Sequence, residues 1–511
     1  MTVRRPKPEH VAYGVLVALA LALRLIDLGA KPFHHDESQD AYFSWLLFTK
    51  GDYVYQPILH GPLRFYLTTT MYALFGDSDF TARLAPALMG TTMVALPYAL
   101  RDQLGRAAAF VSAALLAVGP SYLYFSRFAR EDIYIAAITL ALLVVVFRCV
   151  DSPRRWHPAV IGALLAASFA TKESTFITVF VAGTFFILLV WREGREAPTL
   201  RALSSLGWEA WGWGLAAFAG VFTLLFTVFL THPAGLWDGI YEGLHYWLGQ
   251  HEVGRGGEPA YFYVVLLFAE EWPVLALGAI GTVVAFRQPT VLRAFLVWDF
   301  ALSLAVYSWA GEKFAWLMLH PLLPLILLAG LGAQALWEAR RSAVGRAGLA
   351  LAAIGAVYVL AASWYANAEY PADPREFLVS TQTSEEIPRV ADEVLALARR
   401  NPRLKITVDA ADGATFPWAW YFRDEAVAYQ DLSKVSEPPV ADVLLMTQGD
   451  RDRLQGALPG FEQRRISFRV WWVRDYGAMS PENWGRWLVK REPWNATGGM
   501  PEYLLVRRGL R

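Results

Sequence analysis

The sequence predicts a polytopic α-helical membrane protein: a bundle of about 11 transmembrane helices followed by a C-terminal soluble α/β domain. Three observations predict this class. Of 511 residues, 55% are hydrophobic, more than in an average soluble domain. Apolar runs long enough to span a hydrocarbon core of ~30 Å recur through residues 1–364. After Trp364, short strand-like runs alternate with helical ones, as in a small α/β domain.

The apolar runs predict the membrane helices in order. They lie at residues 11–28, 83–100, 107–124, 133–148, 158–171, 175–191, 212–230, 261–286, 294–309, 317–337 and 347–364. The first run is too long for a signal sequence and lacks a small-residue cleavage site, so we expect it to be retained. Because the number of runs is odd, the two chain ends are expected on opposite sides of the membrane.

Basic residues predict the orientation, because an excess of Lys and Arg marks the cytoplasmic side. One side carries Arg4, Arg5, Lys7, Arg101, Arg106, Arg148, Arg154, Arg155, Arg192, Arg195, Arg201, Arg287, Arg293, Arg340, Arg341 and Arg346. The opposite loops are longer and hold fewer: Lys31, Lys50, Arg64, Arg127, Arg130, Lys172, Arg255 and Lys313. We therefore expect a multi-pass protein of the cell membrane with a cytoplasmic N-terminus and an extracytoplasmic C-terminal domain, residues 365–511.

Two long loops interrupt the transmembrane domain, residues 1–364, on the predicted outer side. Residues 29–82 contain two apolar or amphipathic stretches, Ala41–Phe48 and Leu63–Phe75, which suit helices lying in the membrane interface. Residues 231–260 are rich in Gly, His and Trp. Long ordered loops in compact proteins are usually functional.

The C-terminal domain is expected to alternate helices and strands. A helix is predicted over 384–399, with further helical segments near 417–422, 449–457 and 481–490. Strands are predicted at 405–409, 426–429, 442–446, 466–473 and 503–506.

Composition narrows the class of function. Basic and acidic residues balance at 46 each, which disfavours a nucleic-acid partner. The single cysteine, Cys149, rules out an intramolecular disulfide framework and a cysteine-based zinc site.

The densest polar cluster is residues 34–38, directly after the first helix. Asp36 and Glu37 are adjacent carboxylates, and such a pair can divide labour: one accepts a proton while the other orients an acceptor or a metal. His35 lies beside them as a pocket residue. Mg²⁺ or Mn²⁺ prefers such hard oxygen ligands. The alternative is a solvated loop with surface acids.

Three further charged clusters lie at predicted outer helix ends, where ionisable residues usually mark a pathway or a site. They are Arg127, Arg130, Glu131 and Asp132; then Lys172 and Glu173; then Glu312, Lys313, Trp316 and His320. If the helix ends converge, the cations can hold a phosphate while the carboxylates act on a hydroxyl or a metal. Each cluster taken alone is equally consistent with interfacial anchoring and local ion pairs.

Other polar residues leave alternatives open. His60 precedes Gly61-Pro62 and is either a metal or phosphate ligand or a structural turn residue. Arg24 and Asp27 are three residues apart and are expected to pair with each other. Glu270 and Glu271 interrupt an apolar run and face either a cavity or the outer interface.

In order and spacing, these motifs resemble the GT-C glycosyltransferases, closest to the protein O-mannosyltransferase and aminoarabinose-transferase branch. The resemblance is carried by Leu23-Arg24-Leu25, Asp36-Glu37, His60-Gly61-Pro62, Ser126 to Arg130 and Thr171-Lys172-Glu173. Residues 311–321 and 417–424 are more specifically similar to a prokaryotic subfamily named for association with flippase activity. The tail departs from relatives with a Trp-Trp-Asp motif, because it has Trp418-Ala419-Trp420-Tyr421.

The resemblance implies a polyprenyl-phosphate-sugar donor, an outward-facing bundle active site and an inverting transfer to an acceptor protein, lipid or glycan. It implies that Asp36 is the general base and Glu37 its partner. Arg127, Arg130, Lys172 and Lys313 are implied near the donor phosphate. Glu131, Asp132 and His60 are implied for a divalent metal, which some branches use. His35, Glu312, Trp316 and His320 are expected in the acceptor site or pocket.

Two other functions compete with a glycosyltransferase. A non-catalytic membrane component that handles or flips lipid-linked glycans needs the same lipid-phosphate pocket. A secondary transporter is expected to show paired repeats and helices broken at the membrane midplane. Here the charges gather at outer helix ends instead.

Overall fold

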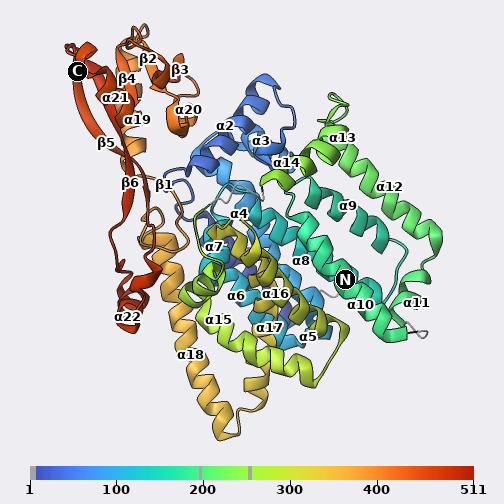
Figure 1. Ribbon diagram of the computed structural model, residues 1–511. Coiled ribbons are helices and arrows are strands. Elements are labelled where there is room, and N and C mark those ends of the chain that lie inside the picture. The colour runs from blue at the N-terminus through green and yellow to red at the C-terminus, as the bar shows by residue number, and fades with distance from the viewer. Residues whose placement is uncertain (1–6, 195–197, 251–255, 511) are drawn as a thin grey trace, which may run out of the picture.

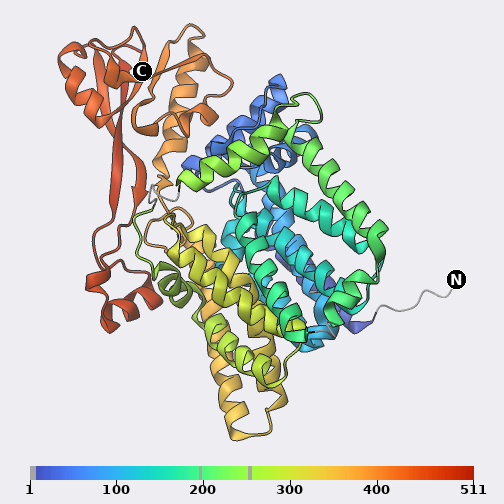
Figure 2. The same ribbon diagram turned by 45° about the vertical axis from the view of Figure 1, so that its right-hand side comes forward.

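The computed structural model describes residues 7–194, 198–250 and 256–510. It is a bundle of long helices with a sheet-containing C-terminal domain at one end (Figures 1 and 2). In both views that domain lies beside the helices of the first long loop. The predicted fold class is therefore confirmed.

Each predicted apolar run falls on a helix. The helices are α1 (Pro8–Leu25), α4 (Asp79–Ala95) continued by η2 (Leu96–Leu100), α6 (Arg106–Val118) continued by α7 (Pro120–Ser126), α8 (Asp132–Asp151), α9 (His157–Phe169), α10 (Thr175–Glu193), α12 (Gly207–Phe226), α15 (Phe262–Arg287), α16 (Val291–Trp309), α17 (Leu319–Glu338, preceded by η5, Ala315–Met318) and α18 (Ala343–Trp364). The short helices α5 (Arg101–Leu104) and α11 (Pro198–Ser204) join them.

Eight helices among the described residues are long and apolar enough to cross a membrane, or nine if α6 and α7, bent by 54°, form one span. The other two predicted spans correspond to α9, with 13 residues, and α4, with 17. A multi-pass membrane protein is confirmed, whereas the count of 11 spans stays a prediction.

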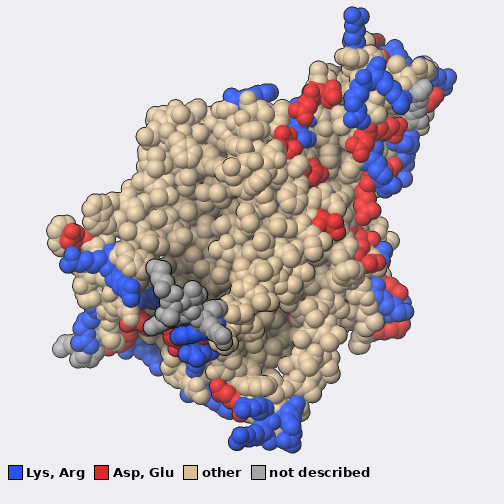
Figure 3. Space-filling model, turned by 180° about the vertical axis from the view of Figure 1, so that it is seen from behind, with Lys and Arg blue, Asp and Glu red and all other residues tan. Residues whose placement is uncertain are grey.

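The surface agrees with membrane insertion. On the face seen in Figure 3, Lys, Arg, Asp and Glu gather on the C-terminal domain and at the opposite end of the bundle, with a broad, nearly uncharged band between them. Large apolar side chains such as Trp191, Ile187 and Leu351 are well exposed on α10 and α18. Exposed apolar surface of this extent fits contact with lipid.

The orientation remains a prediction, and a reporter fusion tests it. Arg4, Arg5, Arg195 and Arg255, which contribute to the charge count, lie outside the described residues. Alkaline phosphatase fused after Trp364 should be active, because the basic loops predict that this helix end is extracytoplasmic. A fluorescent protein that folds only in the cytoplasm should be dark at the same position. The reverse pattern would place the candidate site on the wrong face.

The two long loops are helical. The first contains α2 (His35–Lys50), η1 (Pro57–Leu59) and α3 (Leu63–Phe75). The second contains α13 (Gly235–Trp237), η4 (Asp238–Glu242) and α14 (Gly243–Gln250), while its residues 251–255 lie outside the described part of the chain.

The C-terminal domain follows α18 through η6 (Tyr365–Glu369) and forms a mixed sheet. The strands are β1 (Gln382–Thr383), β2 (Ile406–Asp409), β3 (Val427–Gln430), β4 (Val443–Thr447), β5 (Phe461–Trp471) and β6 (Gly498–Arg507), in the spatial order β1-β5-β6-β4-β2-β3. The helical segments are α19 (Glu386–Arg400), η7 (Ala411–Gly413), α20 (Trp418–Tyr421), η8 (Leu432–Lys434), α21 (Gln448–Leu454), η9 (Gln455–Ala457), η10 (Tyr476–Ala478) and α22 (Pro481–Lys490). The parallel trio β3-β2-β4 is extended by antiparallel β6 and β5.

The domain is fastened to the first loop by α20. Trp420 is fully buried, packs against Phe33 and Tyr72, and donates from Nε1 to Asp79 at 2.8 Å. Arg423 forms an ion pair with Asp77 at 2.7 Å. These contacts hold the C-terminal domain against the start of α2.

A second attachment lies beside the bundle, where the long β5–β6 ribbon ends at α22 (Figure 1). The buried Arg491 guanidinium lies 3.5 Å from Glu270 and 3.3 Å from Glu376. Glu271 accepts from the Ser121 backbone N–H at 3.2 Å. Both glutamates of α15 are thus fully buried.

The predicted pairing of Arg24 with Asp27 is wrong. The buried Arg24 side chain instead donates to the backbone carbonyls of Leu116 and Ala117 at 2.9 and 3.1 Å, near the end of α6 where the chain bends into α7. A bent helix leaves carbonyls without intrahelical partners, and a buried guanidinium supplies donors for them.

Candidate functional site

The site begins at the N-terminus of α2, which the sequence closes with a capping box. The His34 ring accepts from the Asp36 N–H at 3.1 Å, and the Glu37 carboxylate accepts from the His34 N–H at 3.0 Å. Such reciprocal caps fix the entry of the chain into a helix. Asp36 and Glu37 are therefore held in defined and different directions.

Glu37 points into the protein. Its carboxylate accepts hydrogen bonds from Arg83 Nε at 2.8 Å, from Arg83 Nη2 at 2.9 Å and from the Ala129 N–H at 2.8 Å. The side chain is fully buried. Glu37 thus joins α2, α4 and the segment after α7, and this geometry favours a positioning role over direct contact with a substrate or metal.

Asp36 faces the opposite way, toward Arg130. Its Oδ2 lies 3.2 Å from Arg130 Nη1 and 3.8 Å from His34 Nδ1, and a quarter of its side chain is exposed. Burial alone would raise the pKa of Asp36, but Arg130 and the neighbouring histidines hold it well below its ordinary value. Asp36 is a partly accessible, ionised carboxylate.

Glu131 lies at the centre of a cage of cations. Its Oε1 lies 2.9 Å from Arg130, 3.1 Å from Lys172 and 3.2 Å from His60, while Arg64 contacts Oε2. Burial would raise the pKa of Glu131, but these cations hold it well below its ordinary value. The cage ties together residues from three separate segments of the sequence, 60–64, 130–131 and 172.

Two more carboxylates complete the cluster. Asp132 lies 2.8 Å from Lys172, and Asp40 lies 2.7 Å from Arg64. Asp40 follows Asp36 by one helical turn and therefore lies on the same face of α2. The acidic side chains Asp36, Asp40, Glu131 and Asp132 thus surround three cations, Arg64, Arg130 and Lys172.

The turn at residues 60–62 is required for this cage. Gly61 N–H donates to Thr171 O at 3.1 Å, and Leu63 N–H donates to Ala170 O at 2.8 Å. A Cβ on Gly61 would lie 2.2 Å from the Ala170 carbonyl, so only glycine allows this approach. His60 is brought between Glu131 and Glu173, 2.8 Å from the latter.

Aromatic rings form one wall. Trp316 is 97% buried and stacks on Phe314 and Phe128. The centroid of its ring lies 5.4 Å from Arg130 Cζ. Its indole N–H is buried with no hydrogen-bond partner among the described residues. This N–H can therefore donate to an oxygen atom of a ligand.

The remaining residues of the last predicted cluster lie around this wall. His320 stacks on Tyr307 with ring centroids 4.7 Å apart, and its buried Nε2 has no partner in the described part of the chain. Lys313 is mostly buried and donates to the Ala310 carbonyl. Glu312 is partly exposed.

His35 joins the site to the C-terminal domain. Its Nδ1 lies 2.8 Å from Arg469 Nη2 on β5, and its Nε2 lies 2.8 Å from the Gln39 side-chain amide. Because a guanidinium only donates, Nδ1 of neutral His35 accepts from Arg469 and the ring proton is on Nε2. The Gln39 amide then turns its oxygen toward Nε2 to accept this proton. Arg469 also donates to the carbonyls of Gly413 and Phe416, at 2.7 and 3.1 Å.

This contact predicts a pH dependence. Burial and Arg469 lower the pKa of His35 below its ordinary value of 6.5. The unfolded chain therefore binds this proton more readily, so the stability supported by neutral His35 is complete above about pH 6.5 and is lost as pH falls. His35→Asn keeps an acceptor for Arg469 but does not titrate. Between pH 7 and 5 the free energy of unfolding should fall more for the unmodified protein than for His35→Asn.

Unfolding in detergent micelles, followed by tryptophan fluorescence, measures this difference. Groups such as His34 and Asp36 are common to both proteins, so their contributions largely cancel. A difference that does not change with pH would remove His35 as the titrating group.

Arg127 does not join the cation cluster. Its guanidinium points to the end of α1 and donates to the carbonyls of Leu23 and Ile26 at 2.7 and 2.6 Å. The chain turns between residues 127 and 131, which sends Arg127 and Arg130 to opposite sides. The expectation that Arg127 contacts the same phosphate as Arg130 is not supported by this geometry.

The predicted metal ligands do not fit a divalent ion in this arrangement. Glu131, Asp132 and His60 each face a cation or another side chain of the cage. Among the residues that the structure describes, no group of three or more His, Cys, Asp or Glu side chains is arranged to hold a metal. Glu131, Asp132 and His60 therefore act here as partners of the cation cluster and not as a ligand set for Mg²⁺ or Mn²⁺.

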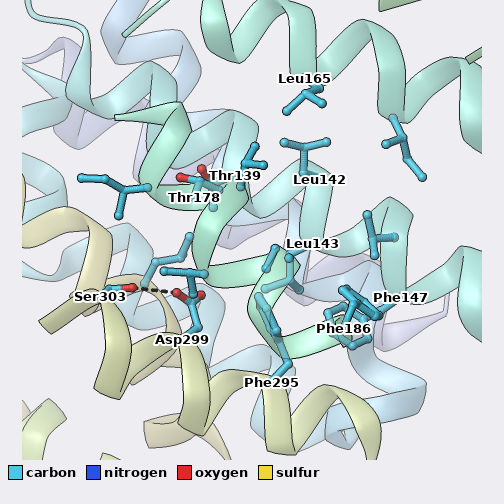
Figure 4. A pocket seen from close by; sticks show the side chains of 18 of the residues that line it. Thr139, Leu142, Leu143, Phe147, Leu165, Thr178, Phe186, Phe295, Asp299 and Ser303 are labelled. Atoms are coloured by element: carbon cyan, nitrogen blue, oxygen red, sulfur yellow. Dashed lines mark hydrogen bonds between the residues drawn. The ribbon is translucent and has the colours of Figure 1, made fainter. Parts of the chain in front are cut away.

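An apolar cavity of about 330 Å³ lies within the bundle next to the site, between α8, α9, α10, α16 and α17 (Figure 4). Leu142, Leu143, Phe147 and Phe295 line it, and Asp299 bonds Ser303 at 2.8 Å on one side. His320 and Tyr307, which stack on each other, also line the cavity. The cavity therefore shares His320 with the last predicted polar cluster, whereas the residues of the cation cluster do not line it.

Comparison with known proteins agrees with the predicted resemblance. Residues 59–206 match the model of a family described as dolichyl-phosphate-mannose-protein mannosyltransferase. No curated protein matches the sequence significantly. The matched segment contains Arg64, Arg130, Glu131 and Lys172.

Solved structures resemble the whole chain. ArnT from Cupriavidus metallidurans in the apo state matches 97% of this chain and 98% of its own, with a TM-score of 0.61 and 15% identity. The structure of the same protein bound to undecaprenyl phosphate matches this chain with a TM-score of 0.59. The Archaeoglobus fulgidus oligosaccharyltransferase AglB, solved with an inhibitory peptide and a dolichol-phosphate, matches 81% of this chain and 59% of its own, at 12% identity and a TM-score of 0.52.

The arabinofuranosyltransferase AftD from Mycobacteria matches 98% of this chain and 40% of its own, with a TM-score of 0.52 and 14% identity. These matches confirm the predicted resemblance to the GT-C glycosyltransferases. Because the sequence identities are only 12–15%, these matches show a shared fold and no more. Membership of the flippase-associated subfamily stays a prediction.

Proposed function

We propose that this chain, which has the GT-C fold of membrane glycosyltransferases, transfers a sugar from a polyprenyl-phosphate-linked donor to an acceptor on the outer face of the membrane. The observation that carries the proposal is the convergence of a partly exposed carboxylate, Asp36, with the cations Arg130 and Lys172 beside an apolar cavity. Such a site can bind the phosphate of a carrier lipid while the lipid chain stays in the bilayer.

The donor would be held by both parts of this arrangement. Part of the polyprenyl chain would occupy the cavity between α8, α10 and α16. Its phosphate would meet Lys172, Arg130 and Lys313, with the free Trp316 and His320 nitrogens nearby. Arg127 is left out, because it lies on the other side of the 127–131 turn.

The transfer needs one base. The acceptor hydroxyl attacks the anomeric carbon and forms the new C–O bond, while the bond between that carbon and the phosphate oxygen breaks. Polyprenyl phosphate leaves with the electron pair, and Asp36 takes the hydroxyl proton. A single displacement inverts the anomeric configuration.

Donor binding would also prepare the base. Without a donor, Arg130 holds the pKa of Asp36 well below its ordinary value, which makes it a weak base. A donor phosphate competes for Arg130 and Lys172, whose charges carboxylates otherwise neutralise. As Arg130 turns to the phosphate, the basicity of Asp36 rises at the moment when an acceptor proton has to be removed.

Arg130 should therefore contribute directly to donor affinity. Arg130→Ala should weaken binding of a polyprenyl-phosphate sugar by about 1.5–3 kcal/mol, the range of a charge-assisted hydrogen bond. Isothermal titration of the detergent-purified protein measures the effect. The matched control is Lys50→Ala, an exposed cation at the end of α2. Equal affinities for Arg130→Ala and the unmodified protein would place the phosphate elsewhere.

Activity itself separates catalysis from the alternative, a non-catalytic component that handles or flips lipid-linked glycans. Purified protein is reconstituted into liposomes with polyprenyl-phosphate sugars and native membranes as the source of acceptor, and mass spectrometry identifies the products. A glycosylated product that Asp36→Asn does not form supports the transferase. Donor binding without any product from the unmodified protein supports the alternative.

A further inference from the structure

A second groove lies at the same end of the bundle, between α1, α7 and α18. It has a volume of about 520 Å³, and Asp36 is not among the residues that line it. Its lower walls are apolar and include Leu23, Val118, Leu360 and Trp364, the last of which is 61% exposed. In Figure 1, α7 and the C-terminal half of α18 lie side by side here, and the two helices are in contact.

The rim of this groove carries two cations, Lys31 and Arg127, and one carboxylate, Asp27. Neither cation shares an ion pair with Asp27 in the described part of the chain. The Lys31 ammonium lies 4.5 Å from the ring centroids of Tyr124 and Phe128 and donates to the Tyr124 hydroxyl at 3.4 Å. Glu37, at 3.8 Å, is already engaged by both nitrogens of the Arg83 fork.

Lys31 is therefore a cation in a poorly solvated place. Burial lowers its pKa to about 7, although Glu37 opposes the shift. An anion in the groove would restore the solvation that this ammonium has lost. Arg127, which donates to the carbonyls at the end of α1, adds a second positive charge to the lining of the groove.

One polar atom in the groove lacks a partner. The Asn367 amide nitrogen donates to the Ser363 carbonyl at 3.0 Å, but its buried Oδ1 accepts no hydrogen bond among the described residues. Buried acceptors of this kind are usually satisfied. The groove thus offers positive charge for a phosphate, an acceptor for a hydroxyl and an apolar channel for a hydrocarbon chain.

We infer that this groove binds an anionic glycerophospholipid with a hydroxylated headgroup, from the leaflet on the side of the C-terminal domain. Its phosphate lies between Lys31 and Arg127, a headgroup hydroxyl donates to Asn367, and an acyl chain follows α1 and α18. A phosphate without a headgroup hydroxyl, such as a polyprenyl phosphate, would leave Asn367 unsatisfied. The inference does not depend on the proposed transferase activity.

Native mass spectrometry with added lipid tests the inference. The purified full-length protein is titrated with phosphatidylglycerol, phosphatidylcholine or polyprenyl phosphate of matched chain saturation. We expect one phosphatidylglycerol to be retained in preference to both other lipids, and Lys31→Met to weaken its retention about tenfold, as loss of a charge-assisted contact does. Lys50→Met removes an exposed lysine of the same side and should have no effect.

A second variant covers the case in which Lys31→Met does not fold. Ser363→Trp fills the groove without changing charge and should abolish the retained lipid. Equal retention of phosphatidylglycerol and phosphatidylcholine, or an equal loss in Lys50→Met, would show non-specific binding and overturn the inference. Preferred binding of polyprenyl phosphate would overturn the assigned occupant.

Discussion

Asp36→Asn should reduce sugar transfer by about 10²–10⁴-fold, the usual contribution of a positioned general base. The substitution keeps the shape of the side chain and removes its basicity. The pairs that build the site, Glu37 with Arg83 and Glu131 with Lys172, do not involve Asp36, so the fold should persist. Donor binding should be retained, because Arg130 loses a competing carboxylate.

Product formation in liposomes and donor titration of the same preparation measure the two quantities separately. Asp40→Asn is the informative companion, since Asp40 lies one turn further along the same face and pairs with Arg64. Near-normal turnover in Asp36→Asn would end the assignment of Asp36 as the base. Loss of turnover in Asp40→Asn alone would move that role to Asp40.

The segments that form the candidate site could be predicted from the sequence, but the contacts between their side chains could not. Charged clusters at outer helix ends indicated residues 34–38, 127–132, 172–173 and 312–320, and the structure brings parts of all four together. Asp40 was missed although its spacing from Asp36 is a sequence signal. Arg469 was missed because no local pattern links β5 to a residue more than 400 positions earlier.

The remaining differences between prediction and structure concern neighbouring residues whose side chains point in different directions. Asp36 and Glu37 are chemically alike, yet successive residues of a helix point about 100° apart, so one reaches the cluster and the other the interior. Arg127 and Arg130 are separated by a turn that no composition signal marks. In the C-terminal domain, hydrophobic periodicity predicted five of the six strands and missed the two-residue β1. The strand order β1-β5-β6-β4-β2-β3 depends on contacts between distant segments.

Arg83 is the residue whose loss should cost most stability. Its guanidinium donates to Glu37 at 2.8 and 2.9 Å and to the Lys31 carbonyl at 2.8 Å, and the side chains of Arg83 and Glu37 are fully buried. Removing one partner of such a pair leaves an uncompensated buried charge, which costs about 3–5 kcal/mol. Arg83→Met should lower the free energy of unfolding by this amount, measured by denaturant titration in mixed micelles.

Arg423→Met is the matched control, because Arg423 pairs with Asp77 at the partly exposed contact between the domains. Such a pair contributes about 0–1 kcal/mol. The double variant Arg83→Met, Glu37→Gln should recover part of the loss, since the buried carboxylate charge is then gone as well. If Arg83→Met and Arg423→Met cost the same, the Glu37–Arg83 pair is not what holds the start of α2 against α4. The direction of Asp36 would then have to be fixed by the capping box alone.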